Sequence, residues 1–184
     1  MIYFTSDTHF GHENSIRHCS RPFESAHDMD YTILANINNL VKAQDTLWHL
    51  GDFAWSNPRM YLRSLACQHV HLLLGNHDKG RCIKELGHMS TEGLLTLHLG
   101  LVDMAIDGHK LTLCHYPMRS WNCSFHGAWH LYGHVHGKSS SWANAMDVGV
   151  DANKYKPVSW DSVVQLMESP ENVARWEKTI KCRT

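Results

Sequence analysis

Short apolar runs that stop at Asp, His or Asn recur along the chain and constrain its fold more than any other feature. The clearest is Leu72-Leu73-Leu74-Gly75-Asn76-His77-Asp78, in which a glycine and three polar side chains end an apolar run. Such a run is typical of a buried strand, and open α/β sheets place their sites at the carboxyl ends of their strands. Four further runs end alike: 1–6 before Asp7 and His9, 46–50 before Gly51-Asp52, 111–114 before His115, and 130–132 before Gly133-His134-Val135-His136-Gly137. We therefore expect five strands that bring metal-ligand chemistry to one edge.

The first half of the chain alternates between strand and helix patterns. Apolar side chains between residues 28 and 41 recur with the helical period, and Asn57-Pro58 resembles an N-cap followed by proline at the first helical position. The expected elements are strands at 46–50 and 70–74, helices at 28–41, 57–67 and 81–86, and a polar loop at 10–22.

The second half is richer in hairpin signals. Asp107-Gly108 separates two strand-like stretches and predicts a tight turn. Strands are also expected at 131–132 and 146–150, and closing helices after Ser159 and Ser169-Pro170. Together the halves predict the α/β class, with two packed mixed β-sheets flanked by helices in an αββα sandwich. With 184 residues, we expect a single domain over residues 1–184.

Composition narrows the function. The formal net charge is -1, whereas proteins that grip nucleic acid usually carry a basic excess, so tight nucleic-acid binding is disfavoured. No apolar run approaches the length of a membrane helix, and the N-terminus lacks a secretory signal pattern. The six cysteines are scattered without a C-x-x-C pair, which fits reduced thiols. We therefore expect a cytoplasmic protein without a membrane partner; the oligomeric state stays open.

The individual motifs differ in specificity. Asp7-x-His9 places two ligands on one face of a strand end, but alone it fits a capping Asp and a surface His equally well. Gly51-Asp52 is a frequent turn, and His115 alone fits a core histidine. Gly133-His134-Val135-His136-Gly137 is the strongest motif, although turn histidines are common in a chain with 16 of them.

The conjunction of these motifs points to a metal centre. The candidate ligands are Asp7, His9, Asp52, Asn76, His115, His134 and His136. These donors are too many for one transition metal, but they suit two ions that share a carboxylate. Oxygen and imidazole ligands without thiolate favour Mn²⁺, with Fe, Zn²⁺ or Ni²⁺ as alternatives.

The order D-x-H, G-D, G-N-H-D, H and G-H-x-H, spread over residues 7 to 136, resembles the calcineurin-like metallophosphoesterase superfamily, and the opening Phe4 to His12 resembles its small single-domain bacterial and viral branch. The resemblance implies two mixed sheets between helices. It also implies that Asp7, His9, Asp52 and His136 hold one ion and Asp52, Asn76, His115 and His134 the other, with Asp52 bridging. His77 is implied to protonate or stabilise the leaving oxygen, and Asp78 to orient His77.

The chain departs from the patterns of some members of the superfamily, and these differences narrow the expected function. Phosphoprotein phosphatases of the superfamily carry glycine after the first His and Arg-Gly after the second block, whereas Phe10 and Phe53-Ala54-Trp55 stand here. Scaffolding members that lost catalysis lack the His after the Asn, and His77 is retained. We therefore expect a metal-dependent phosphoric ester hydrolase that uses a metal-bridging hydroxide on a small phosphoester, with diesters favoured.

Two alternatives stay open, and the substrate contacts are hypotheses. A nuclease acting on nucleic-acid ends could use the basic side chains near the motifs, which are Arg17, Arg21, Lys79, Arg81 and Arg119. A non-catalytic, metal-stabilised interaction module could present an aromatic surface from Trp121, Trp129, Trp142 and Trp160. Candidate substrate contacts are His12, Asn14 and Arg119, which lie in loops next to ligand motifs, although the first two could simply brace their loop.

Overall fold

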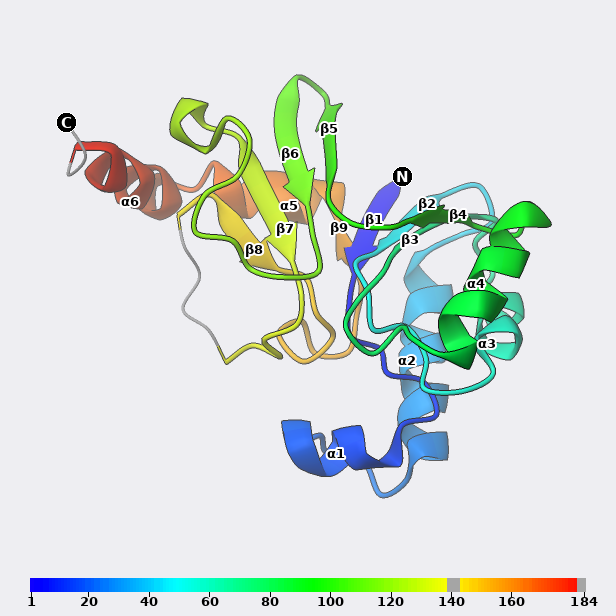
Figure 1. Cartoon of the computed structure of the whole chain (residues 1–184). Coiled ribbons are helices and arrows are strands. Elements are labelled where there is room, and N and C mark those ends of the chain that lie inside the picture. Colours follow the sequence, from blue (N-terminus) through cyan, green and yellow to red (C-terminus); the bar gives the residue numbers. More distant parts are fainter. Residues whose placement is uncertain (139–142, 182–184) are drawn as a thin grey trace.

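A computed structural model of the chain describes residues 1–138 and 143–181 and shows two mixed β-sheets with helices outside them (Figure 1). The first sheet has the strand order β4-β3-β2-β1-β9, and the second has the order β5-β6-β7-β8. The predicted α/β class with two packed mixed sheets is confirmed. Among the described residues, no helix is both long and apolar enough to cross a membrane.

The first sheet is parallel except at one edge. Its strands are β1 (Ile2–Thr5), β2 (Thr46–His49), β3 (His69–Leu73), β4 (Thr96–His98) and β9 (Val158–Ser159), of which β9 alone runs antiparallel to its neighbour. Its helices are α1 (Glu13–Cys19), α2 (Ala26–Leu40), α3 (Pro58–Ser64) and α4 (Arg81–Thr91). The parallel register brings the carboxyl ends of β1, β2 and β3 together, which is where the sequence places the first three ligand motifs.

The second sheet combines a hairpin with two parallel pairings. It contains β5 (Val102–Ile106), β6 (His109–Leu113), β7 (Trp129–Tyr132) and β8 (Ala145–Asp147), followed by α5 (Trp160–Met167) and α6 (Pro170–Lys181). The hairpin predicted at Asp107-Gly108 is confirmed, since both residues have positive φ, as a type I′ turn requires. The predicted capping serines are also seen, since Ser159 accepts from the Ser162 N–H and Ser169 from the Asn172 N–H.

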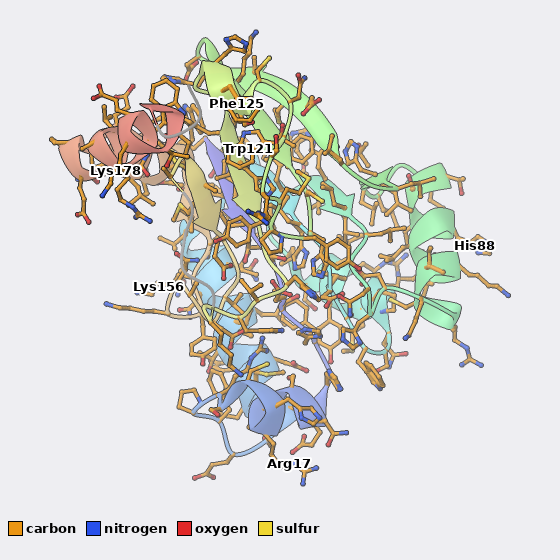
Figure 2. All side chains as sticks on the ribbon, turned by 60° about the vertical axis from the view of Figure 1, so that its left-hand side comes forward. Arg17, His88, Trp121, Phe125, Lys156 and Lys178 are labelled. Carbon is orange, nitrogen blue, oxygen red and sulfur yellow. The ribbon has the colours of Figure 1, made fainter. Side chains whose placement is uncertain are left out.

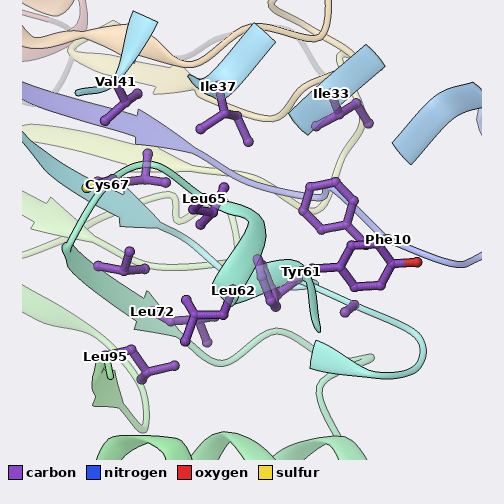
Figure 3. Close-up of a cluster of buried hydrophobic side chains, with 14 of the residues drawn as sticks. Phe10, Ile33, Ile37, Val41, Tyr61, Leu62, Leu65, Cys67, Leu72 and Leu95 are labelled. Carbon is purple, nitrogen blue, oxygen red and sulfur yellow. The ribbon is translucent and has the colours of Figure 1, made fainter. Parts of the chain in front are cut away.

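Two hydrophobic clusters lie on opposite faces of the first sheet. One packs β3 against α2, α3 and α4 through residues such as Ile33, Ile37, Leu62 and Leu72 (Figure 3). The other fills the space between the sheets and beneath α5. Leu72 belongs to the first cluster and its neighbour Leu73 to the second, so β3 is buried on both faces. This two-sided burial explains why Leu72 and Leu73, at the end of β3, are both apolar.

Some predicted boundaries were wrong. Residues 10–22 contain α1, which seven residues of weak periodicity did not reveal. The helix expected through Cys67 ends at Ser64. The strand-like stretch at 94–107 is two strands that belong to different sheets, because exposed residues 99–101 carry the chain from one sheet to the other.

Candidate metal centre

The carboxyl ends of strands from both sheets meet at one place. The Asp7 N–H donates to the Gly51 carbonyl, and the Gly133 N–H donates to the His115 carbonyl, each at 3.0 Å. A bridge between Ser6 and Gly149 joins the end of β1 to the segment after β8. The two hydrogen bonds each join neighbouring strand ends within one sheet, and the Ser6–Gly149 bridge joins the two sheets, so the five motifs share one edge.

The predicted ligands have unusual backbone conformations. Positive φ angles between 50° and 70° occur at Asp7, His9, Asp52, His134 and His136. Asp and His tolerate this left-handed region better than most residues, but each such residue carries strain that the surrounding structure must offset. Such strain clusters at functional sites because it aims side chains that a relaxed strand end would splay apart.

Two glycines make room for the predicted carboxylate ligands. A Cβ on Gly75 would overlap the Oδ1 atom of Asp52, and a Cβ on Gly133 would overlap Asp7 Oδ2 and Ser6 Oγ. Both glycines therefore permit a close approach between a turn and a carboxylate. This gives a physical reason for the glycine in the Gly-Asn-His-Asp and Gly-His-Val-His motifs.

The first group of candidate ligand atoms joins the first and last motifs. Ligand atoms of Asp7, His9 and His136 all lie within 4.8 Å of one another. His136 Nε2 is 4.0 Å from Asp7 Oδ1, a buried carboxylate oxygen that has no hydrogen-bond partner among the described residues. A buried, unpartnered carboxylate oxygen beside two imidazoles suits a cation that coordinates it.

Asp52 lies close to His9 of the first group and to His115. Its Oδ2 atom is 3.6 Å from His9 Nε2 and 3.5 Å from His115 Nε2. Two ligand atoms that each lie roughly 2.1 Å from one ion are separated by about 3 to 4 Å, so both spacings fit shared coordination. A second group of candidate ligand atoms, within 4.8 Å of one another, consists of Asp7, Asp52 and His115.

His115 is oriented so that it can coordinate a cation. Its Nδ1 lies 2.9 Å from the Leu50 carbonyl, which can only accept, so the proton of the neutral ring is on Nδ1. The lone pair on Nε2 then faces Asn76 Oδ1 at 3.0 Å and Asp52 Oδ2 at 3.5 Å. A cation among these three atoms would be coordinated by all of them. The donor set therefore fits a divalent metal ion.

Burial sets the protonation of these groups. Burial raises the pKa of Asp7 to about 7, although the neighbouring His136 opposes this shift. Burial also lowers the pKa of His115 to about 4, and it lowers the pKa of both His9 and His134. These three histidines are therefore neutral near pH 7 and offer lone pairs to a metal. Asp7 needs nearby positive charge to stay fully ionised, which a bound cation supplies.

The structure brings all seven candidate ligands together. His134 packs against His115 with ring centroids 5.1 Å apart, and its backbone N–H donates to Asp7 Oδ2. Asp7, His9, Asp52 and His115 are buried, whereas Asn76, His134 and His136 are half-buried and form the more open side.

Asp78 does not act on His77 as the resemblance implied. Its carboxylate accepts from the backbone N–H groups of Asp52 at 2.7 Å, Gly75 at 2.8 Å and Phe53 at 3.0 Å. The His77 Nδ1 atom is buried and has no hydrogen-bond partner. Asp78 therefore braces the two turns that carry Asp52 and Gly75, because three converging N–H groups satisfy its carboxylate more fully than one ring could.

His77 and His12 stand beside the cluster. The ring centroids of His77 and His9 are 5.3 Å apart, and those of His12 and His77 are 6.1 Å apart. His12 also stacks on Trp55, which the sequence did not indicate as a site residue. Asn14 is exposed and accepts from Arg17, and Arg119 is exposed in the loop after β6, so neither is buried within the cluster.

The sequence did not reveal a buried ion pair of Asp151 and Arg21 that lies behind His136. His136 Nδ1 lies 2.7 Å from Asp151 Oδ2, and Arg21 holds both oxygens of that carboxylate at 2.9 and 2.8 Å. The same guanidinium donates to the carbonyls of Asp7 and Thr8. Asp151 follows the apolar residues 148–150, so the pattern that revealed the other motifs could have found it.

Arg21 therefore has a different role from the one considered for nucleic-acid binding. Its side chain is buried against Asp151 rather than exposed in a loop. Ligand atoms of Cys19, His136 and Asp151 also form a compact group, but the paired Arg21 charge opposes a cation at Asp151. We interpret Asp151 as a support for His136, the role that carboxylates commonly have behind metal-bound histidines.

Comparison with known proteins places the chain in a family without assigning its activity. No family model matches the sequence. The uncharacterized protein MJ1445 of Methanocaldococcus jannaschii is 31% identical over 179 residues, which cover 91% of each chain. The chain belongs to the family of MJ1445.

A solved structure shares the fold of this MJ1445 family member. The protein of unknown function AQ665 from Aquifex aeolicus has a TM-score of 0.70 and 27% identity, over 90% of this chain and 98% of its own. A novel archaeal phosphodiesterase has a TM-score of 0.47 and 19% identity, over 80% of this chain and 81% of its own. At that level of similarity, nothing about activity follows for the MJ1445 family.

Proposed function

We propose that this protein is a calcineurin-like metallophosphoesterase that hydrolyses a phosphoester with two divalent ions, Mn²⁺ being favoured. The observation that carries the proposal is the position of Asp52 Oδ2 between His9 Nε2 and His115 Nε2, with the lone pair of His115 facing oxygen acceptors. Asp7, His9, Asp52 and His136 would hold one ion, and Asp52, Asn76, His115 and His134 the other. When bound, such ions activate water and neutralise the charge on a phosphoryl group.

His77 is the group that fits proton transfer to the leaving oxygen. It lies next to His9 at the open side of the cluster, and its backbone N–H donates to Asp52 Oδ1 at 2.8 Å. This bond fixes the start of the His77 side chain relative to the shared carboxylate. A histidine placed in this way can donate a proton where the ester bond breaks, which commonly contributes about 10²- to 10⁴-fold to the rate.

We favour a diester substrate because of charge. A monoester dianion gains from an extra cationic side chain, but the buried Arg21 beside Asp7 is committed to Asp151 and to backbone carbonyls. A diester carries only one negative charge and needs less compensation. Rates on an aryl diester and on the matching aryl monoester, measured side by side with Mn²⁺, test this preference.

The main test uses His77→Ala and Asp52→Asn. We expect His77→Ala to lower kcat on an aryl diester by about 10²-fold or more. We expect Asp52→Asn to lower both activity and bound metal, because both proposed ions would share this carboxylate. His88→Ala, on the outer surface of α4 (Figure 2), and Asp28→Asn, exposed in the first turn of α2, are matched controls. Unchanged activity in both test variants would overturn the proposal.

The two alternative functions have less support. The nuclease alternative loses one of its candidate basic side chains, because Arg21 is buried, although Arg17 projects outward (Figure 2). The aromatic surface of an interaction module loses Trp129 and Trp160, which are buried in the core between the sheets, and Trp142 lies outside the described residues. Strongly salt-dependent cleavage of DNA or RNA ends would favour the nuclease. Metal retention without turnover on a broad phosphoester panel would favour the module.

A further inference from the structure

We propose that Trp55 is a stacking surface for a planar aromatic ring that the substrate carries next to its scissile phosphoester. The inference rests on the proposed function and adds the chemical class of the substrate. Trp55 follows the Asp52 turn and is 52% exposed, so its indole presents apolar surface to solvent next to a buried polar cluster. A ring that stacks on it would remove this apolar surface from water.

The backbone around Trp55 is held in place. Its N–H donates to the Phe10 carbonyl at 2.8 Å, and the Phe10 N–H donates to the Phe53 carbonyl at 3.0 Å. A bridge between Phe10 and Ala54 joins the segments that follow Asp7 and Asp52. Trp55 is therefore fixed to the same turns as the candidate ligands, so its exposure is a property of an ordered segment.

His12 covers one side of the indole and sets its direction. The two rings are 4.0 Å apart and nearly parallel, at 5°. Among the described residues, the buried His12 Nδ1 atom has no hydrogen-bond partner. Since Trp55 keeps half of its surface exposed despite this stacking, it still presents apolar area to a ligand.

Trp55 lies within reach of an ester bound at the cluster. Its ring centroid is 6.0 Å from that of His77, which is 5.3 Å from the ring of His9. A leaving group whose oxygen contacts His77 therefore extends past Trp55. Aromatic rings stack with centroids about 4.5–7 Å apart, so a ring attached directly or through a sugar to that oxygen can meet the indole.

A small pocket continues from Trp55 away from the metal ligands. Its volume is about 120 Å³, and it is lined by Trp55, Ser56, Asn57, Pro58, Arg81, Cys82 and Glu85. Arg81 supplies donors and Glu85 supplies acceptors, so this pocket can receive the polar edge of a heterocycle as well as an unsubstituted ring. Nucleobases and phenols share the planar π-face that the indole would bind, and the polar edge distinguishes them.

The test separates binding of the ring from turnover by using phosphonates, whose C–P bond is not hydrolysed. Dissociation constants of methylphosphonate, phenylphosphonate and a phosphonate analogue of adenosine 5′-monophosphate are measured by calorimetry on the Mn²⁺-loaded protein. The variants are Trp55→Ala, Trp55→Phe and the control Tyr31→Ala, whose ring on α2 is 71% exposed. The quantity compared is the ratio of the methyl to the phenyl dissociation constant.

We expect phenylphosphonate to bind about tenfold or more tightly than methylphosphonate, as base–aromatic stacking commonly allows. The ratio should fall to near one in Trp55→Ala and persist in Trp55→Phe and Tyr31→Ala. Tighter binding of the adenosine analogue than of phenylphosphonate identifies a nucleobase, whereas equal binding identifies a general aryl site; both support the stacking surface.

A ratio near one in the unaltered protein, or a ratio that survives Trp55→Ala, overturns the inference. Hydrolysis of an aryl diester together with a ratio near one leaves the proposed function intact and removes only the stacking surface. A Trp55-dependent ratio without hydrolysis of any phosphoester has the opposite meaning: the ring site stands and the proposed activity fails.

Discussion

Two histidines of the candidate centre are held in contrasting ways. His115 is bound through Nδ1 to the backbone carbonyl of Leu50 at 2.9 Å. His136 is bound through Nδ1 to the carboxylate of Asp151 at 2.7 Å, and Arg21 forms a buried salt bridge with that carboxylate. In both cases Nδ1 is occupied and Nε2 faces the candidate carboxylate ligands, so two different supports give the same orientation.

The two supports differ in the segments that they join, in the charges that they bury and in the pKa of the histidine that they hold. The Leu50 carbonyl belongs to the segment that also carries Asp52, so His115 depends on the backbone of the first sheet. The Arg21–Asp151 pair joins separate segments and requires two buried charges to stay matched. Burial is the largest cause that lowers the pKa of His115 to about 4. Burial also opposes protonation of His136, but Asp151, Cys19 and Asp7 together raise the pKa of His136 to about 10. The His136 side is therefore the more sensitive to single substitutions.

The largest effect should come from removing the buried positive charge of the Arg21 side chain. Arg21→Met leaves Asp151 buried without its bidentate partner, and we expect a loss of about 3–5 kcal/mol in the free energy of unfolding. Denaturant unfolding of the metal-free protein measures this loss. Arg59→Met is the matched control, because Arg59 makes a bidentate pair with Glu92 that is exposed to water. Equal losses in the two variants would mean that the buried Arg21–Asp151 pair contributes no more to stability than the exposed Arg59–Glu92 pair.

A smaller and more selective effect is expected from Asp151→Asn. The amide retains the shape of the carboxylate but not its charge, so it orients the His136 ring less firmly. We expect one of the two Mn²⁺ affinities to weaken about 10- to 100-fold while the other is retained. Calorimetric titration resolves the two ions, and nitrogen NMR of the His136 ring reports its tautomer independently of activity. Equal weakening of both affinities would contradict the separation of the two supports.

The sequence predicted the ligands because each motif is local. A buried strand followed by a turn is visible as an apolar run that ends in glycine and polar residues, and Leu72 to Asp78 shows this without any tertiary information. The parallel register then brings the ends of separate runs together. The two mixed sheets followed from the same reasoning, since the hydrophobic periodicity changes where the second sheet begins.

The remaining features depend on tertiary structure. The positive φ angles at Asp7, His9 and Asp52 cannot be inferred from residue identity, because most Asp and His residues have ordinary backbone angles. The bonds of Asp78 to three backbone N–H groups depend on how two turns approach each other. Arg21 appeared to be a loop charge because its partner Asp151 lies 130 residues away in the sequence.

The smallest expected effect concerns His49, which supports the turns beneath both groups. The Thr8 hydroxyl donates to the Phe53 carbonyl at 2.7 Å, so it accepts from His49 Nε2 at 2.9 Å, and His49 Nδ1 accepts from the Gly51 N–H. Burial lowers the pKa of His49 from 6.5 to about 3. Below pH 6.5 the unfolded chain takes up a proton that the folded protein does not, so this contribution to stability is complete above pH 6.5 and is lost as the pH falls towards 3.

We therefore expect His49→Gln, which keeps a donor and an acceptor but cannot titrate, to flatten the acid side of the stability profile. At pH 5.5, one unit below the unfolded pKa, the wild-type loss from this residue is about 1.4 kcal/mol relative to neutral pH. Denaturant unfolding of the metal-free variant and wild type at pH 7.5 and 5.5 measures the difference. His88→Ala, on the exposed face of α4, should leave the slope unchanged. If the free energy of unfolding of His49→Gln falls as steeply between pH 7.5 and 5.5 as that of wild type, His49 is not held neutral in the folded protein. The support beneath the two groups is then not an uncharged one.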